Sequence, residues 1–135
     1  MFDVNTKVLV VDDMLTMRKI VMKTCKEIGF TNIVDAADGQ KAWEILTTSE
    51  VPFGLIISDW NMPNCTGLDL LKRVRADGRL KILPFIMLTA ESEGHQVAEA
   101  VKSGVDNYII KPFTAEILKT KLGETHKKTA KRLAA

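Results

Sequence analysis

The sequence predicts an α/β fold: a doubly wound parallel sheet of five strands with five helices. Short apolar runs suited to buried strands alternate with segments of helical spacing along the whole chain. Glycines, prolines and polar residues separate these segments. The 135 residues, of which 46% are hydrophobic and 27% charged, suffice for one domain with a proper core and are too few for two ordinary ones.

Five segments are predicted as strands from their short apolar runs. They are residues 7–11, 32–36, 55–58, 85–88 and 107–110. Asp35 interrupts the second of them, and this predicts that strand at an edge of the sheet. Asp59 comes directly after the third, followed by residues that do not prolong a central strand.

The first three helices follow from apolar residues three and four positions apart. Thr16 is the expected N-cap of the first, which Gly29 ends. Its expected core positions are Met17, Ile20, Val21, Cys25 and Ile28. The second, ending at about Thr48, has the core stripe Ala42, Ile45 and Leu46. The third turns Leu68, Leu71 and Val74 inward and leaves Lys72, Arg73 and Arg75 mostly solvated.

The last two helices differ in how well they are anchored. The fourth, from about Glu93 to Ser103, is stopped by Gly104 and has three apolar anchors, Val97, Ala98 and Val101. It is therefore expected to be the least firmly held, because burial supplies most helix stability in proteins. The last helix has the anchors Phe113, Leu118 and Leu122.

Composition and charge exclude several classes of protein. The net charge is +2, and residues 123–135 hold four basic residues against one acidic one, so the body is almost neutral and nucleic-acid binding is not indicated. No secretory signal and no membrane span is visible, which predicts a cytoplasmic protein. Cys25 and Cys65 fit no metal-binding spacing and are expected to be reduced, structural thiols.

Four predicted strands end in residues that carry chemistry, namely Asp12-Asp13, Asp59, Thr89 and Lys111. The carboxyl ends of parallel strands meet at one edge of a sheet, where such folds bind their ligands. Alone, each residue is more simply a helix cap or a solvated charge. Together, three carboxylates repel one another by roughly 4 kcal/mol per close pair, and Lys111 supplies only one positive charge. Oxygen ligands of this kind suit Mg²⁺.

This set of residues is suited to phosphoryl transfer. Asp59, alone at the end of its strand, is the better nucleophile, and Asp12 and Asp13 are better placed to bind the metal or orient its waters. Thr89 would donate a hydrogen bond to the phosphoryl group, and Lys111 would offset its charge.

The same residues resemble the motifs of two-component response regulator receiver domains, most closely the single-domain chemotaxis regulators. The matching motifs are Val10-Val11-Asp12-Asp13, Ser58-Asp59-Trp60-Asn61-Met62-Pro63, Thr89-Ala90-Glu91 and Lys111-Pro112-Phe113. Residues 16–21, 37–39 and 75–78 extend the similarity over about residues 7–122. The resemblance implies a flavodoxin-like fold with strand order 2-1-3-4-5, and a single receiver domain over residues 1–135 whose positions 123–135 form a basic tail.

The resemblance also implies roles for individual residues. Asp59 would accept a phosphoryl group from a chemotaxis-type histidine kinase. Mg²⁺ would bind Asp13, Asp59 and the backbone carbonyl of Asn61, with Asp12 acting through water. Lys111 would contact the acyl phosphate, with a cis Lys111-Pro112 bond. Thr89 and Tyr108 would form a switch pair. Such a protein is a phospho-acceptor rather than an enzyme that turns over an external substrate.

The implied output is control of flagellar rotation by a monomer that binds the motor switch protein, with a phosphatase as a further partner. The chain departs from the chemotaxis pattern at Glu93-Gly94, where a lysine pair is usual, on the expected partner surface. Met14 replaces a usual Phe, and the loop through Val51-Pro52 is about two residues longer than usual.

Three alternatives stay open. A receiver could instead act as a phosphate sink or on a partner other than the motor. A phosphatase with an Asp nucleophile, of the haloacid-dehalogenase type, needs a general acid two residues after it, where Asn61 cannot deliver a proton. A flavodoxin-like electron carrier would need a phosphate-binding loop after the first strand, where Asp12-Asp13 would repel a flavin phosphate.

Overall fold

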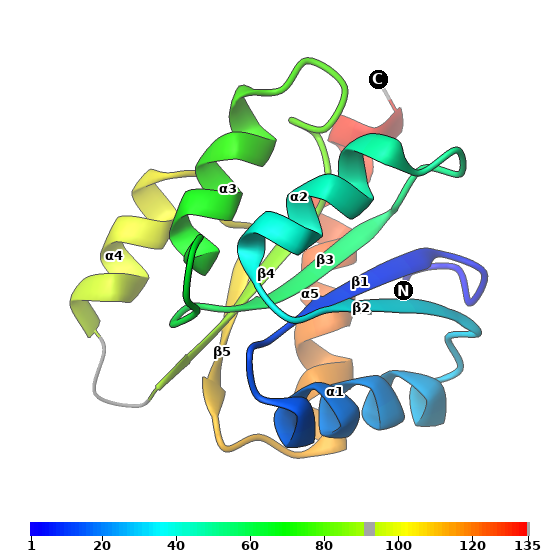
Figure 1. The fold of residues 1–135 in the computed structure, drawn as a ribbon. Helices are drawn as coiled ribbons and strands as arrows, with labels where there is room; N and C mark the ends of the chain where they lie inside the picture. Colours follow the sequence, from blue (N-terminus) through cyan, green and yellow to red (C-terminus); the bar gives the residue numbers. More distant parts are fainter. Residues whose placement is uncertain (91–93, 135) are drawn as a thin grey trace.

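The structure of the chain, a computed structural model, describes residues 1–90 and 94–134. Five strands form one parallel sheet in the order β2-β1-β3-β4-β5, as predicted (Figure 1). They are β1 (Lys7–Val11), β2 (Asn32–Ala36), β3 (Leu55–Asp59), β4 (Phe85–Ala90) and β5 (Asn107–Lys111). The helices of the described residues are α1 (Leu15–Ile28), α2 (Gly39–Thr48), α3 (Gly67–Ala76), α4 (Gly94–Lys102) and α5 (Ala115–Ala134). Strand β2, which carries Asp35, lies at an edge of the sheet.

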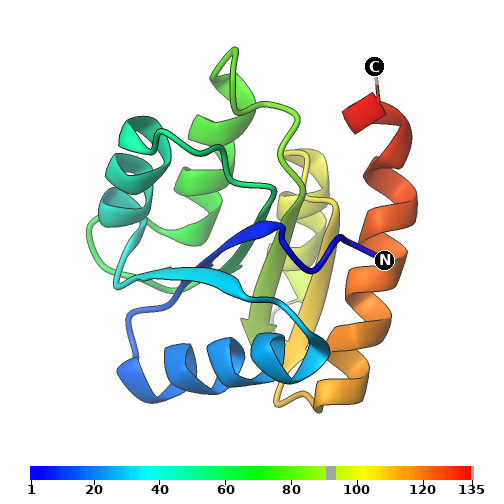
Figure 2. The same cartoon turned by 90° about the vertical axis from the view of Figure 1, so that its right-hand side faces the viewer.

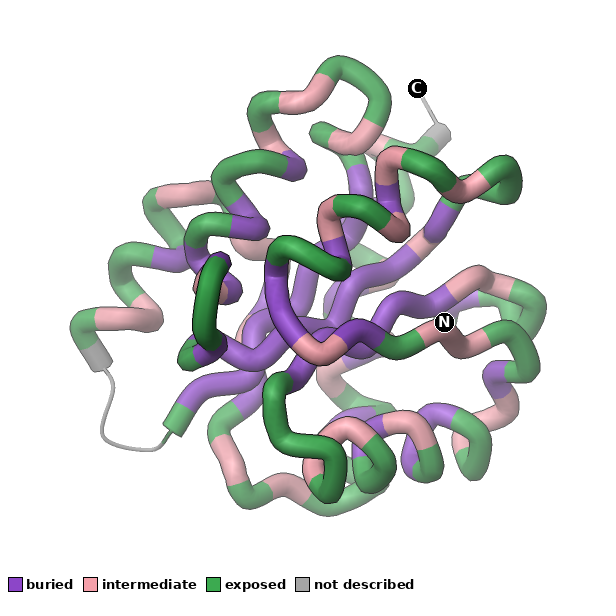
Figure 3. The backbone as a smooth tube through the Cα atoms, in the orientation of Figure 1, coloured by how far each residue is buried: buried purple, intermediate pink, exposed green. Residues whose placement is uncertain are grey.

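The sheet lies between two layers of helices. Helices α2, α3 and α4 cover one face, and α1 and α5 cover the other (Figures 1 and 2). Successive residues of a strand point to opposite faces, so Leu9 and Val11 pack under the first layer while Val8 and Val10 pack under the second. The tube in Figure 3 accordingly changes from buried strands at the centre to mixed burial along the helices. Burial on both faces explains why the central strands are continuous apolar runs.

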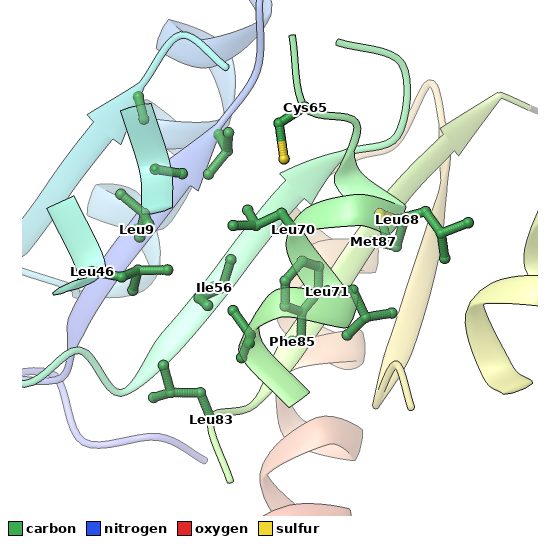
Figure 4. Packing of buried hydrophobic residues seen from close by; sticks show 14 of the residues in the cluster. Leu9, Leu46, Ile56, Cys65, Leu68, Leu70, Leu71, Leu83, Phe85 and Met87 are labelled. Carbon is green, nitrogen blue, oxygen red and sulfur yellow. The ribbon is translucent and has the colours of Figure 1, made fainter. Parts of the chain in front are cut away.

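The first layer is anchored through α3. Leu70 and Leu71 of this helix are fully buried, as are Ile56 of β3 and Phe85 of β4 beneath them (Figure 4). Each side chain of this size contributes about 1.5–3 kcal/mol when fully buried. The helix begins with a capping box in which Thr66 and Asp69 exchange side-chain and backbone hydrogen bonds. The segment between β3 and α3 is therefore held at both ends, by the buried strand and by the capped start of the helix.

Helix α1 begins two residues earlier than the sequence predicted. Its N-cap is Met14 and no side chain caps it, so the prediction of Thr16 as N-cap is wrong. The physical reason is that the Asp12 carboxylate accepts a hydrogen bond from the Met14 N–H at 2.9 Å and turns the chain into the helix before Thr16. Ile20, predicted to face the core, is 47% exposed, and the buried positions of the helix are Val21, Thr24 and Cys25.

Helix α4 is held through a different residue than the sequence predicted. Ala100 is fully buried against the first layer and Val97 is half-buried. Ala98 is exposed and Val101 is 59% exposed, so these two predicted anchors are wrong. Val101 directly follows the buried position, which turns it about 100° away from the sheet. The expected start at Glu93 lies outside the described residues.

Helix α5 runs straight through residue 122, where the sequence predicted the core to end and a tail to begin. The side chains of Thr125 and Thr129 are fully buried, and their hydroxyls donate to the carbonyls of Lys121 and Thr125 at 2.7 and 2.9 Å. The N-terminal ammonium group lies 3.1 Å from His126 Nδ1 on the same helix. None of the described helices has both the length and the apolar character that a membrane span requires.

The last turn of α5 contacts Asp106, the residue before β5. Arg132 and Arg75 of α3 both pair with the Asp106 carboxylate, each with contacts of 2.9 Å. Arg75 also donates to the carbonyl of Leu83 at 2.6 Å. Its side chain is thus largely buried, and the prediction that Arg75 is mostly solvated is wrong, because its partners come from distant segments.

Candidate functional site

Four strand ends carry the candidate site. Asp12 follows β1 directly, Asp59 is the last residue of β3, Thr89 is the fifth of the six residues of β4, and Lys111 is the last of β5. The parallel register places Asp59 beside Leu88 and Thr89 beside Ile110. The predicted convergence at one sheet edge therefore occurs.

Three carboxylates gather at this edge. Asp12, Asp13 and Asp59 each offer an oxygen, and these atoms lie within 4.8 Å of one another. Asp12 and Asp59 are buried and Asp13 is exposed, so the cluster opens to solvent on one side. Lys111 Nζ lies 2.6 Å from Asp59 Oδ1 and 4.0 Å from Asp12 Oδ2. Among the described residues, one ammonium group thus lies beside three carboxylates.

Burial works against ionisation of the two buried acids. It raises the pKa of Asp59 above its ordinary value of 3.8, although the hydrogen bond and charge of Lys111 act in the opposite direction. Burial likewise raises the pKa of Asp12, opposed by the hydrogen bond from the Met14 N–H and reinforced by the charge of Asp59. A cation bound at this cluster would stabilise the ionised forms.

Among residues 1–90 and 94–134, two buried polar atoms at this edge have no hydrogen-bond partner. They are Asp12 Oδ2 and Thr89 Oγ1, in side chains that are each 1% exposed. A buried polar atom without a partner costs about 1–3 kcal/mol. Groups that a fold leaves unpaired at such a cost are expected where a ligand supplies the missing contact.

The segment between β3 and α3 is held close to Asp59. The Trp60 N–H donates to the Leu88 carbonyl at 3.1 Å, and the Trp60 carbonyl accepts from the Gly67 N–H at 2.9 Å. A Cβ at position 67 would collide with the Asp59 carbonyl oxygen, so only glycine fits there. Asn61, the expected carbonyl ligand, is exposed between these fixed points.

The same loop is fastened to the start of α2, which the sequence did not predict. Asn64 has a positive φ of 66° and donates from Nδ2 to Asp38 Oδ2 at 3.3 Å. Asp38 itself caps α2 by accepting from the Lys41 N–H. Asp38 lies in one of the matching motifs, residues 37–39, and its contact with Asn64 depends on a segment distant in the sequence.

The predicted switch residue Tyr108 is the second residue of β5. Its half-buried ring has Lys121 Nζ 5.5 Å from its centroid. A groove of about 480 Å³ lies beside it, lined by Tyr108, Ile109, Ile110, Lys111, Pro112, Ile117 and Lys121. The Lys111-Pro112 bond is cis. Glu93, expected on the partner surface, lies outside the described residues.

Comparison with known proteins places these features in context. A family model described as "Response regulator receiver domain" matches residues 8–123. The chain is 48% identical over 116 residues to the "Chemotaxis protein CheY" of Pseudomonas aeruginosa, covering 86% of this chain and 92% of that protein. It is also 48% identical over 116 residues to the "Chemotaxis protein CheY1" of Helicobacter pylori, covering 86% and 93%. A solved structure of the chemotaxis response regulator CheY4 of Vibrio cholerae superposes with a TM-score of 0.81 at 35% identity, covering 90% of this chain and 98% of that one.

Proposed function

The chain belongs to the response regulator receiver domain family and is of the CheY type, and from this premise we propose that it is a phosphorylation-dependent signalling switch. In this proposal Asp59 accepts a phosphoryl group from a histidine kinase in the cytoplasm, in a reaction that needs Mg²⁺. The phosphorylated form then binds a partner that controls flagellar rotation. CheY-like receiver domains are signalling proteins, and we expect no turnover of an external substrate.

One observation carries the proposal: the unpaired groups around Asp59 are those that a phosphoryl group and a cation would satisfy. Within the described part of the chain, Asp12 Oδ2 is an acceptor without a donor, and Thr89 Oγ1 carries a hydroxyl without an acceptor. Lys111 Nζ already contacts Asp59. A site built only for stability would pair these atoms within the protein.

The donor set fits Mg²⁺, a hard cation that prefers oxygen ligands and retains waters. We assign Asp13, Asp59 and the Asn61 carbonyl as its ligands and Asp12 as the residue that holds a bound water. When bound, Mg²⁺ offsets negative charge on the phosphoryl oxygens. The buried unpaired oxygen of Asp12 supports this assignment, because it is a second feature beside the acidic cluster itself.

In the transfer step, a carboxylate oxygen of Asp59 attacks phosphorus while the bond between phosphorus and the imidazole nitrogen of the kinase breaks. The imidazole leaves with the electron pair of that bond, and the product is an acyl phosphate on Asp59. Lys111 holds the other carboxylate oxygen and balances charge, and the Thr89 hydroxyl donates to a phosphoryl oxygen. These residues position and stabilise, as phosphoryl transfer requires.

The output would arise at the groove beside Tyr108. Movement of Thr89 toward the phosphoryl group would leave space for the Tyr108 ring, which now lies half-buried beside Lys121. An inward ring changes the shape of the groove that residues 108–112, 117 and 121 line. A tenfold gain in partner affinity needs only about 1.4 kcal/mol of differential binding. A flagellar motor switch protein is the proposed partner, since the chain is similar to proteins named for chemotaxis.

Phosphorylation with a small acyl phosphate and Mg²⁺ tests the proposal. The parent protein should gain one base-labile phosphate, seen as a mass increase, and Asp59→Asn should gain none. Asp3→Asn, which changes an exposed carboxylate near the N-terminus, is the matched control and should be labelled like the parent. Equal labelling of Asp59→Asn would show that the acceptor is elsewhere.

A further inference from the structure

The side chain of Arg18 in α1 turns back toward the acidic cluster. Its Nη1 donates to the backbone carbonyl of Asp12 at 2.8 Å, and its Nε donates to Asp35 Oδ2 of the edge strand at 2.7 Å. The side chain is only 13% exposed, although it belongs to a surface helix and its neighbour Lys19 is exposed. One guanidinium thus joins helix α1, strand β2 and the loop that carries the acids.

The orientation of the Asp12 carbonyl determines the direction in which the Asp13 side chain leaves the backbone. This carbonyl and the N–H of Asp13 belong to one planar peptide unit, so fixing one fixes the other. The Asp12 N–H is also held, by the Ala36 carbonyl at 3.2 Å, and the Asp12 carboxylate accepts from the Met14 N–H. Among residues 1–90 and 94–134, no hydrogen bond holds the Asp13 carboxylate. Its placement therefore depends on the backbone that Arg18 fixes.

We propose that Arg18 is a positioning residue for the divalent-cation site, acting through the Asp12 carbonyl on the direction of the Asp13 carboxylate. The inference deepens the proposed function and rests on the cation site stated there. Arginine suits the role because its planar fork holds two acceptors in a fixed geometry, which the single ammonium of lysine does not.

Because Arg18 is positively charged, the direction of the change in Mg²⁺ affinity on its removal tests the inference. Arg18 pairs with Asp35 and with the Asp12 backbone carbonyl, so it holds none of the carboxylates proposed for the cation site. If Arg18 acted only as a charge, its removal would leave the acidic cluster more negative and would strengthen Mg²⁺ binding. If Arg18 positions Asp13, its removal weakens Mg²⁺ binding. The two accounts predict opposite changes.

Titration of the full-length protein with Mg²⁺, followed by the fluorescence of the buried Trp60 beside Asp59, measures the change. Trp43→Phe in every variant removes the second tryptophan. We expect Arg18→Ala to lower the Mg²⁺ affinity roughly tenfold, as loss of an orienting group typically does. Lys19→Ala removes the same charge from the next position of α1 and should leave the affinity unchanged or slightly raised. Urea unfolding with a chelator present reports separately on any structural damage.

An Arg18→Ala protein that is folded and binds Mg²⁺ as tightly as the parent, or more tightly, overturns the role of Arg18 and leaves the cation site standing. If Arg18→Ala does not fold, Arg18→Lys replaces it in the test. This variant keeps the positive charge, and its affinity for Mg²⁺ should still fall about threefold, about 0.65 kcal/mol. Parent-like affinity in folded Arg18→Lys would likewise overturn the role. A parent protein without any Mg²⁺ response overturns the cation site itself, so the two failures are distinguishable.

Discussion

Two clusters of charged side chains at opposite edges of the sheet differ in how their charges are matched. Where β1, β3, β4 and β5 end, Asp12, Asp13 and Asp59 lie around Lys111, and no described residue donates a hydrogen bond to Asp12 Oδ2. Where β4 and β5 begin, one carboxylate, that of Asp106, lies between Arg75 and Arg132. Both of its oxygens accept hydrogen bonds, including one from the Phe85 N–H at 2.9 Å.

The difference separates stability from function. The Asp106 cluster is fully paired within the protein, and it ties α3, the start of β4 and the last turn of α5 to the start of β5. The acidic cluster is left incompletely paired at a cost in stability, which a bound cation and phosphoryl group would offset. Substitutions in the Asp106 cluster should therefore lower the stability of the fold, whereas removing a charge from the acidic cluster should raise it.

The largest effect is expected for Asp106→Ala. It leaves the buried guanidinium of Arg75 and the half-buried one of Arg132 facing each other without an anion, and it removes the acceptor of the Phe85 N–H. Breaking a buried pair from one side costs about 3–5 kcal/mol. Urea unfolding should show a loss near the lower value, because Arg132 is partly exposed. An unchanged unfolding midpoint would mean that the cluster contributes nothing to the fold.

A smaller loss is expected for Arg132→Ala. Arg132 donates to both Asp106 oxygens and to the Ile82 carbonyl, with its side chain 35% exposed. Removing these contacts should cost roughly 1 kcal/mol, since Arg75 still pairs with Asp106. Lys131→Ala is the control, because it removes the same charge from an exposed neighbour and should change stability little. Equal losses in both variants would assign the effect to helix charge rather than to the Asp106 contacts.

The sequence predicted the acidic edge far better than the opposite edge, for a physical reason. In a parallel sheet every strand end lies at a known edge, so the positions of Asp59, Thr89 and Lys111 follow from where each apolar run stops. Arg75 was expected in solvent because nothing in its helix shows that Asp106 and Arg132 lie beside it. Pairing between side chains from distant segments leaves no local pattern.

Local competition accounts for the error at the start of α1. Thr16 is a good capping residue, but the Asp12 carboxylate bonds to the Met14 N–H and starts α1 first. The apolar stripe of α5 stops at residue 122, and the buried Thr125 and Thr129 continue its buried face with hydroxyls that donate to carbonyls of the same helix, which apolar spacing does not reveal. The proposed positioning role of Arg18 leaves no pattern in the sequence, because an arginine on a surface helix is expected in solvent and this one becomes buried only on folding.

A change of similar size but opposite sign is expected for Asp12→Asn measured with a chelator present. The amide can still accept from the Met14 N–H, its nitrogen can donate toward Asp59, and one buried charge is removed, so stability at neutral pH should rise by about 1 kcal/mol. Asp106→Asn, the same substitution at the other edge, should lower stability because the two guanidinium groups lose their anion. A loss of stability in Asp12→Asn would remove the distinction between the edges.

The pH dependence of that gain checks its electrostatic origin. Burial, together with the charge of Asp59, raises the pKa of Asp12 in the folded protein above the ordinary value of 3.8. Because the pKa of Asp12 is higher in the folded than in the unfolded protein, its protonation favours folding. This contribution is fully present below pH 3.8, where the carboxyl is protonated in both states, and is lost as the pH rises through the pKa of the folded protein. The stability difference between Asp12→Asn and the parent should therefore grow from about pH 3.8 upward and then level off. A difference that is constant from pH 3 to pH 8 would show that packing, and not the buried charge, separates the two proteins.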